Sequence, residues 1–197
     1  WLRRGEIQAA NISLNEQFDE KKLRSTLPRM KQLMVDDIEG FFPKLQELCA
    51  ECGVKLVSTQ CLPKAPISGA TRWINDTPIV QLSNRYKRYD IFWFNFFHEI
   101  GHILLHGKKD IFLEHAGCVE NDLVKEQEAD RFASNILLTS NDEQEILKSH
   151  DYSVEGIKWA ASRYGTHPAI IVGRLQHCNA IDYWQDQSLL KSICLDS

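Results

Sequence analysis

The feature that most constrains the fold is an apolar segment that covers residues 91–105 and reads IFWFNFFHEIGHILL. If this segment is a helix, apolar side chains surround its whole circumference, and a helix of that kind belongs inside a protein core. Asp90 is placed to start the helix and Gly107 to end it. Four polar residues interrupt the segment: Asn95, His98, Glu99 and His102. We therefore expect a buried core helix and no membrane-spanning one.

Two histidines of this segment share one face of the predicted helix. His98 and His102 are four residues apart, so both imidazoles can approach the same metal ion, and the carboxylate of Glu99 can reach a water on that ion. A chain of 197 residues folds without a structural metal, so a metal here would indicate chemistry. For the motif alone, the alternative is a pair of hydrogen-bonded core histidines. We interpret His106, one turn further on, as structural, because a helix C-terminus favours an imidazole.

A catalytic zinc site needs a third protein ligand and keeps one position for water or substrate. A metzincin would supply a histidine at position 108, where this chain has Lys108, so that class is excluded. Further along the chain, EQEAD at residues 126–130 lies on a second core helix that apolar spacing predicts over residues 122–138. This segment is the candidate source of the third ligand.

The EQEAD segment places Glu126 and Asp130 on one face of that helix, four residues apart. One carboxylate can ligate the metal while the other accepts the free N–H of a ligating histidine. We predict Glu126 as the ligand and Asp130 as the outer partner, and we rank Glu128 lower because it points away from both on a regular helix. Taken alone, EQEAD also fits an exposed charged helix face.

Periodicity elsewhere predicts helices before and after a small group of strands. The predicted elements are helices over residues 19–34 and 38–52, a strand over residues 54–59, a hairpin of residues 68–74 and 77–83, and helices over residues 143–150, 153–164 and 168–177. This order predicts an α+β fold. An edge of the sheet formed by the hairpin could hold an extended substrate by strand addition.

Composition excludes some classes of protein. With 23 basic and 27 acidic side chains the formal net charge is -4, which argues against nucleic-acid binding through bulk charge. The six cysteines are scattered and the N-terminus lacks a signal peptide, so we expect reduced thiols in the cytoplasm. Cys49 and Cys52 have zinc-binding spacing but no second pair, so we interpret them as ordinary thiols. We interpret Cys118 as an ordinary loop thiol; the alternative is that it occupies the open metal position as an inhibitory thiolate.

Two motifs resemble a known family. FFHEIGHILLHG, followed by EQEADRFASNILL, is similar to the ImmA/IrrE family of zinc metallopeptidases, and HPAIIVGRLQH extends the similarity. The resemblance implies a zincin-like α+β fold, in which a small antiparallel three-stranded sheet packs on the HExxH helix and other helices surround it. It also implies a gluzincin-like site, with His98, His102 and Glu126 as zinc ligands and Glu99 as the catalytic residue. In relatives the position of Asp130 is often Asn.

The resemblance is closest to members in which this domain follows a helix-turn-helix domain of HigA-type antitoxins or repressors. Residues 1–18 are then expected to be a linker or arm, and residues 19–197 the metallopeptidase-like domain with a C-terminal helical hairpin. DNA would be contacted only through a helix-turn-helix domain that this sequence lacks. Expected partners are a repressor, an antitoxin or a toxin; no membrane contact is expected, and a homodimer is left open.

Together these residues predict a cytoplasmic zinc-dependent endopeptidase that acts on a protein such as a partner repressor or antitoxin. The reaction would use a metal-activated water with Glu99 as general base, and other divalent ions fit the same ligands. Four residues are candidates for stabilising the oxyanion or binding substrate: His115, Tyr164, His167 and Arg174. The alternative is a regulatory module of a toxin–antitoxin or transcription-control system that uses this fold to bind a partner without proteolysis.

Overall fold

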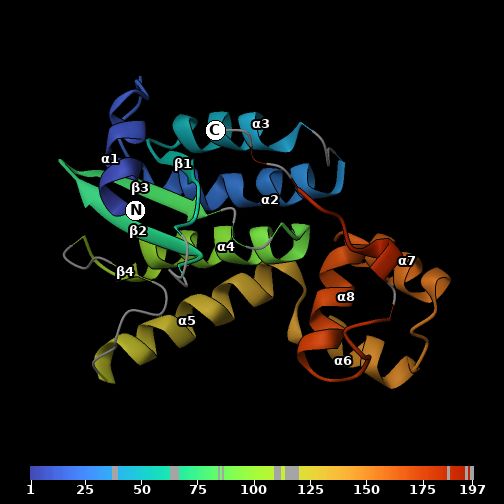
Figure 1. Cartoon of the computed structure of the whole chain (residues 1–197). Coiled ribbons are helices and arrows are strands. Elements are labelled where there is room, and N and C mark those ends of the chain that lie inside the picture. The colour runs from blue at the N-terminus through green and yellow to red at the C-terminus, as the bar shows by residue number, and fades with distance from the viewer. Residues whose placement is uncertain are drawn as a thin grey trace.

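The backbone follows the predicted order of helices, a small sheet and further helices, so the predicted α+β class is confirmed (Figure 1). The computed structural model describes residues 1–36, 40–62, 67–83, 85, 87–108, 112–113, 120–185, 187–193 and 195. The helices are α1 (Leu2–Ala10), α2 (Glu20–Asp36), α3 (Phe41–Glu51), α4 (Tyr89–Leu105), α5 (Glu120–Leu137), α6 (Ser140–Ser149), α7 (Val154–Arg163), α8 (Pro168–His177) and the 3-10 helix η1 (Gln187–Leu189). The strands are β1 (Lys55–Thr59), β2 (Gly69–Ile74), β3 (Thr77–Ser83) and β4 (Phe112–Leu113).

Among the described residues, the strands form one sheet in the order β1-β3-β2-β4. β2 and β3 form the predicted antiparallel hairpin, and its turn residues Asn75 and Asp76 have φ angles of 49° and 63°. Asn and Asp tolerate this left-handed conformation, which matches the twist of the two strands. β4 pairs antiparallel with β2 at Ala70 and Thr71.

The expectation of an antiparallel three-stranded sheet is wrong in detail. β1 pairs in parallel with β3, and β4 adds a fourth strand, so the sheet is mixed. The reason is the connection: the chain passes from β1 to β2 and only then returns to β3, which lies between them. β3 lies inside the sheet and β4 pairs with two residues of β2, so the outer edge of the hairpin is partly covered.

α4 is the predicted core helix and lies between α2 and α5 (Figure 1). Its aromatic side chains Trp93, Phe96 and Phe97 are fully buried. A Cβ added at Gly101 would lie 3.2 Å from the Cα of Ala129 on α5, so the glycine permits a close approach of the two helices. Within the described ranges, neither α4 nor any other helix has the length and apolarity needed to cross a membrane.

Within the N-terminal segment, expected to be a linker or arm, residues 2–10 form helix α1, which contacts β1 and β3. Its contact uses the small residues Gly5 and Ala9, which are buried, instead of a stripe of large apolar side chains. Arg72, 4 % exposed on β2, donates to the carbonyl of Leu2 at 2.7 Å. Side chains alternate along a strand, so Arg72 and α1 lie on the face opposite Thr71, which contacts α4. Helical periodicity cannot detect a contact made of small and polar groups.

A second apolar cluster holds the C-terminal helices together. α7 and α8 pack against each other, and Ile157, Ile171 and Leu175 belong to the buried residues of this cluster. α8 also contacts α4, which brings the C-terminal helices against the N-terminal half of the core helix. α8 begins after His167, whose Nδ1 accepts a hydrogen bond from the N–H of Ala169 at 3.0 Å. His167 therefore caps this helix.

Candidate metal centre

The three residues predicted as metal ligands lie together at the contact of α4 and α5. The Nε2 atoms of His98 and His102 are 2.9 Å apart. Oε2 of Glu126 lies 3.2 Å from Nε2 of His98, and Oε1 lies 3.4 Å from Nε2 of His102. The ligand atoms of all three residues lie within 4.8 Å of one another. One helical turn thus places the two imidazoles, and the packing of α5 on α4 adds the carboxylate.

The chemistry of these donor atoms fits a divalent metal ion. The two Nε2 atoms are 2.9 Å apart, and two lone pairs that face each other at this distance repel. A hydrogen on one nitrogen or a cation between them removes the repulsion. The carboxylate of Glu126 faces the same point from the other helix. Two neutral imidazoles and one carboxylate are the ligand set of an open, catalytic type of zinc site, and they also accept other divalent ions.

Electrostatics distinguishes the three side chains in the metal-free chain. Burial opposes protonation of His98, but hydrogen bonds to Asp130 and Glu126 outweigh burial and raise its pKa to about 10. For His102, burial dominates and lowers the pKa. Burial works against ionisation of Glu126, yet its hydrogen bonds with His102 and His98 lower its pKa to about 2. A proton on His98 therefore occupies the centre at neutral pH, and a metal ion would displace it.

Each imidazole has a further partner on its outer nitrogen. Nδ1 of His98 lies 2.8 Å from Oδ1 of Asp130, the residue that sequence reasoning placed there. Nδ1 of His102 lies 2.9 Å from Nδ1 of His106, whose Nε2 lies 3.1 Å from Oε2 of Glu128. Sequence reasoning treated His106 as structural and ranked Glu128 low. The spacing of four residues from His102 to His106 was the signal that pointed to this contact.

Glu99 is positioned by strand β2. Its side chain is buried, and the hydroxyl of Thr71 donates to Oε2 at 2.6 Å and to the backbone carbonyl of Glu99 at 3.0 Å. A Cβ added at Gly69 would lie 2.3 Å from Oε1, so only glycine leaves room for the carboxylate there. The contact of the sheet with α4 thus fixes the position of this carboxylate against β2. Sequence reasoning missed Thr71 and Gly69, because the register of β2 against α4 is a tertiary property.

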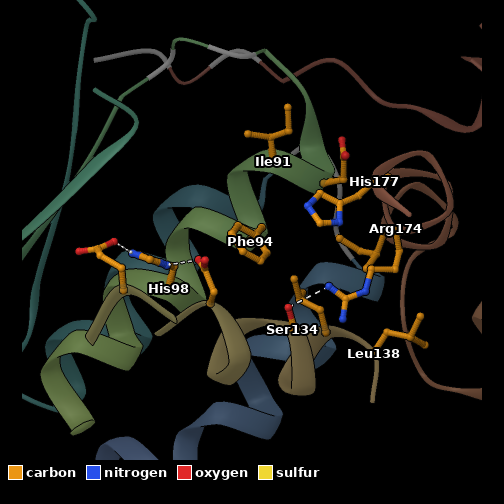
Figure 2. A pocket seen from close by; sticks show the side chains of 13 residues that line it. Ile91, Phe94, His98, Ser134, Leu138, Arg174 and His177 are labelled. Carbon is orange, nitrogen blue, oxygen red and sulfur yellow. Dashed lines mark hydrogen bonds and ion pairs between the residues drawn. The ribbon is translucent and has the colours of Figure 1, made fainter. Parts of the chain in front are cut away.

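A cavity of about 550 Å³ opens beside the ligand group (Figure 2). Its lining comes from three helices: Ile91, Phe94 and His98 on α4, Glu126, Asp130 and Ser134 on α5, and Arg174 and His177 on α8. Figure 2 shows His98 on one side of the cavity and Arg174 on the other. The cavity therefore joins the candidate metal centre to the C-terminal helices.

Of the four residues expected to bind an oxyanion or substrate, the structure describes three. Arg174 lines the cavity, where it donates to Ser134 at 2.8 Å and to Glu143 at 3.0 Å. Tyr164 and His167 do not line it: the Tyr164 hydroxyl donates to Glu145 at 2.8 Å, and His167 caps α8. His115 and the candidate thiolate Cys118 lie outside the described residues.

Comparison with known proteins places these observations in a family. No curated protein matches the chain. A family model described as the IrrE N-terminal-like domain, peptidase M78, matches residues 49–176, from the end of α3 to α8. This match spans more than half of the chain and includes every residue of the ligand group as well as Glu99. The chain therefore belongs to the IrrE N-terminal-like domain family and contains a metallopeptidase-type domain.

Proposed function

We propose that the protein is a zinc-dependent endopeptidase, with His98, His102 and Glu126 as zinc ligands and Glu99 as general base. The observation that carries this proposal is the convergence of the three ligand atoms within 4.8 Å at the contact of α4 and α5, with buried Glu99 directly after the first histidine in the sequence. The family match supports a peptidase. A structural pair of core histidines would not need a carboxylate from a second helix facing both rings.

The side chains around the ligand group have different roles in the proposed peptide hydrolysis. A zinc ion bound there would lower the pKa of a water molecule and polarise the substrate carbonyl. Glu99 accepts the proton of the attacking water and returns it to the nitrogen of the leaving amine. Thr71 orients the carboxylate by donating to Oε2, so we assign the proton transfer to Oε1. Asp130 keeps the Nδ1–H of His98 outward, which directs Nε2 toward the metal.

For the substrate we propose a protein, such as a partner repressor or antitoxin in the cytoplasm. The support is the resemblance of the motifs to domains fused to helix-turn-helix antitoxins and repressors. The cavity beside the ligand group is large enough for part of a peptide. The net charge of -4 gives no reason to propose DNA as a ligand of this domain.

The test combines metal analysis with cleavage. The purified protein is expected to hold about one zinc per chain by elemental mass spectrometry. Incubation with candidate repressors, antitoxins and a denatured protein pool should yield fragments whose new termini mass spectrometry identifies. Glu99→Gln should retain zinc and lose cleavage by at least about 100-fold, since general base catalysis supplies about 10²–10⁴-fold. Glu155→Gln, on the exposed start of α7, is the matched control and should cleave like wild type.

The outcomes separate the candidate functions. Equal loss of the partner protein with wild type and Glu99→Gln would show that this chain is not the protease. Zinc binding together with capture of an intact partner would support the regulatory module instead. Loss of zinc in Glu99→Gln would show that Glu99 is a ligand, contrary to its proposed role.

A further inference from the structure

The cavity beside the ligand group is continuous with it. His98, Glu126 and Asp130 form part of its lining, and the ring centroid of Phe94 lies 6.2 Å from that of His98. The cavity then extends along α5 to Ser134, where Arg174 of α8 makes its hydrogen bond (Figure 2). If the peptide bond to be cleaved lies at the ligand group, the side chain of a residue next to that bond would therefore lie beside this cavity.

The walls of the cavity are largely apolar and come from three helices. They consist of Ile91 and Phe94 on α4, Leu137 on α5, Leu138 directly after α5, and Ile170 on α8. Ile91 and Phe94 are partly exposed, whereas the other three are buried. A side chain that enters the cavity can therefore contact Ile91 and Phe94 without a rearrangement of the core.

Three charged groups of the cavity, Asp90, Asp130 and Arg174, have partners within the chain. Asp90 accepts two hydrogen bonds from Arg88, at 2.8 and 3.1 Å. Asp130 contacts His98, and Arg174 contacts Glu143 at 3.0 Å. A charged side chain that entered the cavity would lose its water and would have to compete with these pairs for an opposite charge, which is unfavourable. An apolar side chain has no favourable hydration of a charge to lose, and its contact with the apolar walls is favourable.

We propose that this cavity is a specificity pocket for one bulky apolar side chain, aromatic or branched aliphatic, next to the cleaved bond of the substrate. The proposal rests on the proposed peptidase function and adds the substrate class. The cavity volume of about 550 Å³ lies in the range of pockets that enclose ligands. Removing one methylene from a side chain in such a pocket changes kcat/KM by about 10-fold or more, so Leu or Phe should exceed Ala by at least that factor.

The first test is cleavage of matched peptides. Once a cleaved bond is known, peptides with Phe, Leu, Ala or Asp on each side of it are compared by kcat/KM. The wild type should prefer Phe and Leu to Ala by at least about 10-fold at one of the two positions, with Asp lowest. Ile91→Trp narrows the pocket at a partly exposed residue and should reverse the preference toward Ala. Ile7→Trp, the same change on exposed α1, is the matched control.

A second variant keeps the pocket testable if Ile91→Trp does not fold. Phe94→Ala enlarges the pocket and should shift the preference toward Trp, with zinc content unchanged. Equal kcat/KM for Phe, Leu, Ala and Asp at both positions, or equal preference in wild type, Ile91→Trp and Phe94→Ala, would overturn the pocket.

A binding measurement separates the pocket from the peptidase function. Zinc-loaded Glu99→Gln protein, labelled at the methyl groups of Ile and Leu, is titrated with acetyl-phenylalanine amide and with acetyl-alanine amide. The phenylalanine amide should shift the methyl signals of Ile91, Leu137 and Ile170, and the alanine amide should not. If these shifts occur but no protein is cleaved, the pocket stands and the peptidase function fails. If cleavage occurs but the two amides act alike, the pocket proposal fails.

Discussion

His98 and His102 are one helical turn apart and equally buried, yet the two regions around them differ in their outer partners. Nδ1 of His98 meets the carboxylate of Asp130 directly. Nδ1 of His102 meets a second imidazole, His106, and only then a carboxylate, Glu128. Accordingly, the pKa of His98 is raised to about 10, whereas burial lowers that of His102. The partner on the outer nitrogen, and not burial alone, thus determines which ring holds an additional proton.

The hydrogen-bond pattern of both regions leads to the same metal-facing arrangement. If His106 donates Nε2–H to Glu128, its Nδ1 accepts the Nδ1–H of His102. His102 then directs the lone pair of Nε2 toward the ligand group, as His98 does when it donates Nδ1–H to Asp130. The two regions therefore reach one geometry with different outer partners: a carboxylate for His98 and a second imidazole for His102.

The largest effect is expected from removing the carboxylate that both regions share. Glu126→Gln should weaken zinc binding by more than about 100-fold, because it removes a ligand, whereas loss of an outer partner costs about 10–100-fold. Competition with a chelator measures this affinity. Glu47→Gln, exposed on α3, is the control and should bind like wild type. A change of less than about 10-fold in Glu126→Gln would exclude Glu126 as a ligand.

The next effect concerns the His98 region. Asp130→Ala should weaken zinc binding by about 10–100-fold, because His98 loses its outer acceptor. Asp130→Asn keeps an oxygen acceptor without the charge and should recover most of the affinity. Asp182→Ala, exposed beyond α8, serves as the control. Equal loss in Asp130→Ala and Asp130→Asn would show that charge, and not orientation of the ring, is what Asp130 supplies.

A smaller effect is expected in the His102 region, where the outer partner is an imidazole and not a carboxylate. His106→Ala should weaken zinc binding by about 10-fold, at the low end for an outer partner. His106→Asn places an amide oxygen near the position of Nδ1 and should restore the affinity. The matched control is His150→Asn, at an exposed residue with φ of 50° that suits Asn. If all three variants bind zinc like wild type, the His106 contact has no part in the centre.

The smallest effect is the pH dependence of the metal-free protein. His98 has a pKa raised above the ordinary 6.5, so its contribution to stability is complete below pH 6.5 and is lost as the pH rises through about 10. The Tm of the metal-free protein should fall by at least roughly 2–4 °C between pH 7 and pH 10.5. Imidazole NMR should show His98 protonated at pH 7 and His102 neutral. Titration of His98 near 6.5 would contradict the raised pKa.

Much of the fold and part of the candidate site could be predicted because they depend on local spacing. Residues four apart share a helix face wherever the helix packs, so His98 and His102, and likewise Glu126 and Asp130, could be paired from sequence. The burial of α4 followed from apolar residues all around it. The turn at Asn75 and Asp76 was visible because these residue types suit its backbone angles.

What could not be predicted depends on how distant elements meet. α1 escaped detection because it packs through Gly5 and Ala9 and is held by a buried arginine. The direction of β1 beside β3 depends on the path of the connection and not on the composition of either strand. Glu128 points away from Glu126 on its own helix, yet it reaches the last turn of α4 because the two helices cross closely at Gly101.

By itself, the sequence determined the class of the fold, the core helix and which side chains share a face, since these follow from periodicity and residue chemistry. Only the tertiary structure decided which faces meet: the placing of Thr71 and Gly69 around Glu99, the route from His102 through His106 to Glu128, and the cavity beside His98. The physical reason is the separation in sequence between the residues that interact. A helix repeats every few residues along the chain, whereas packing joins residues whose separation in sequence carries no signal of their separation in space.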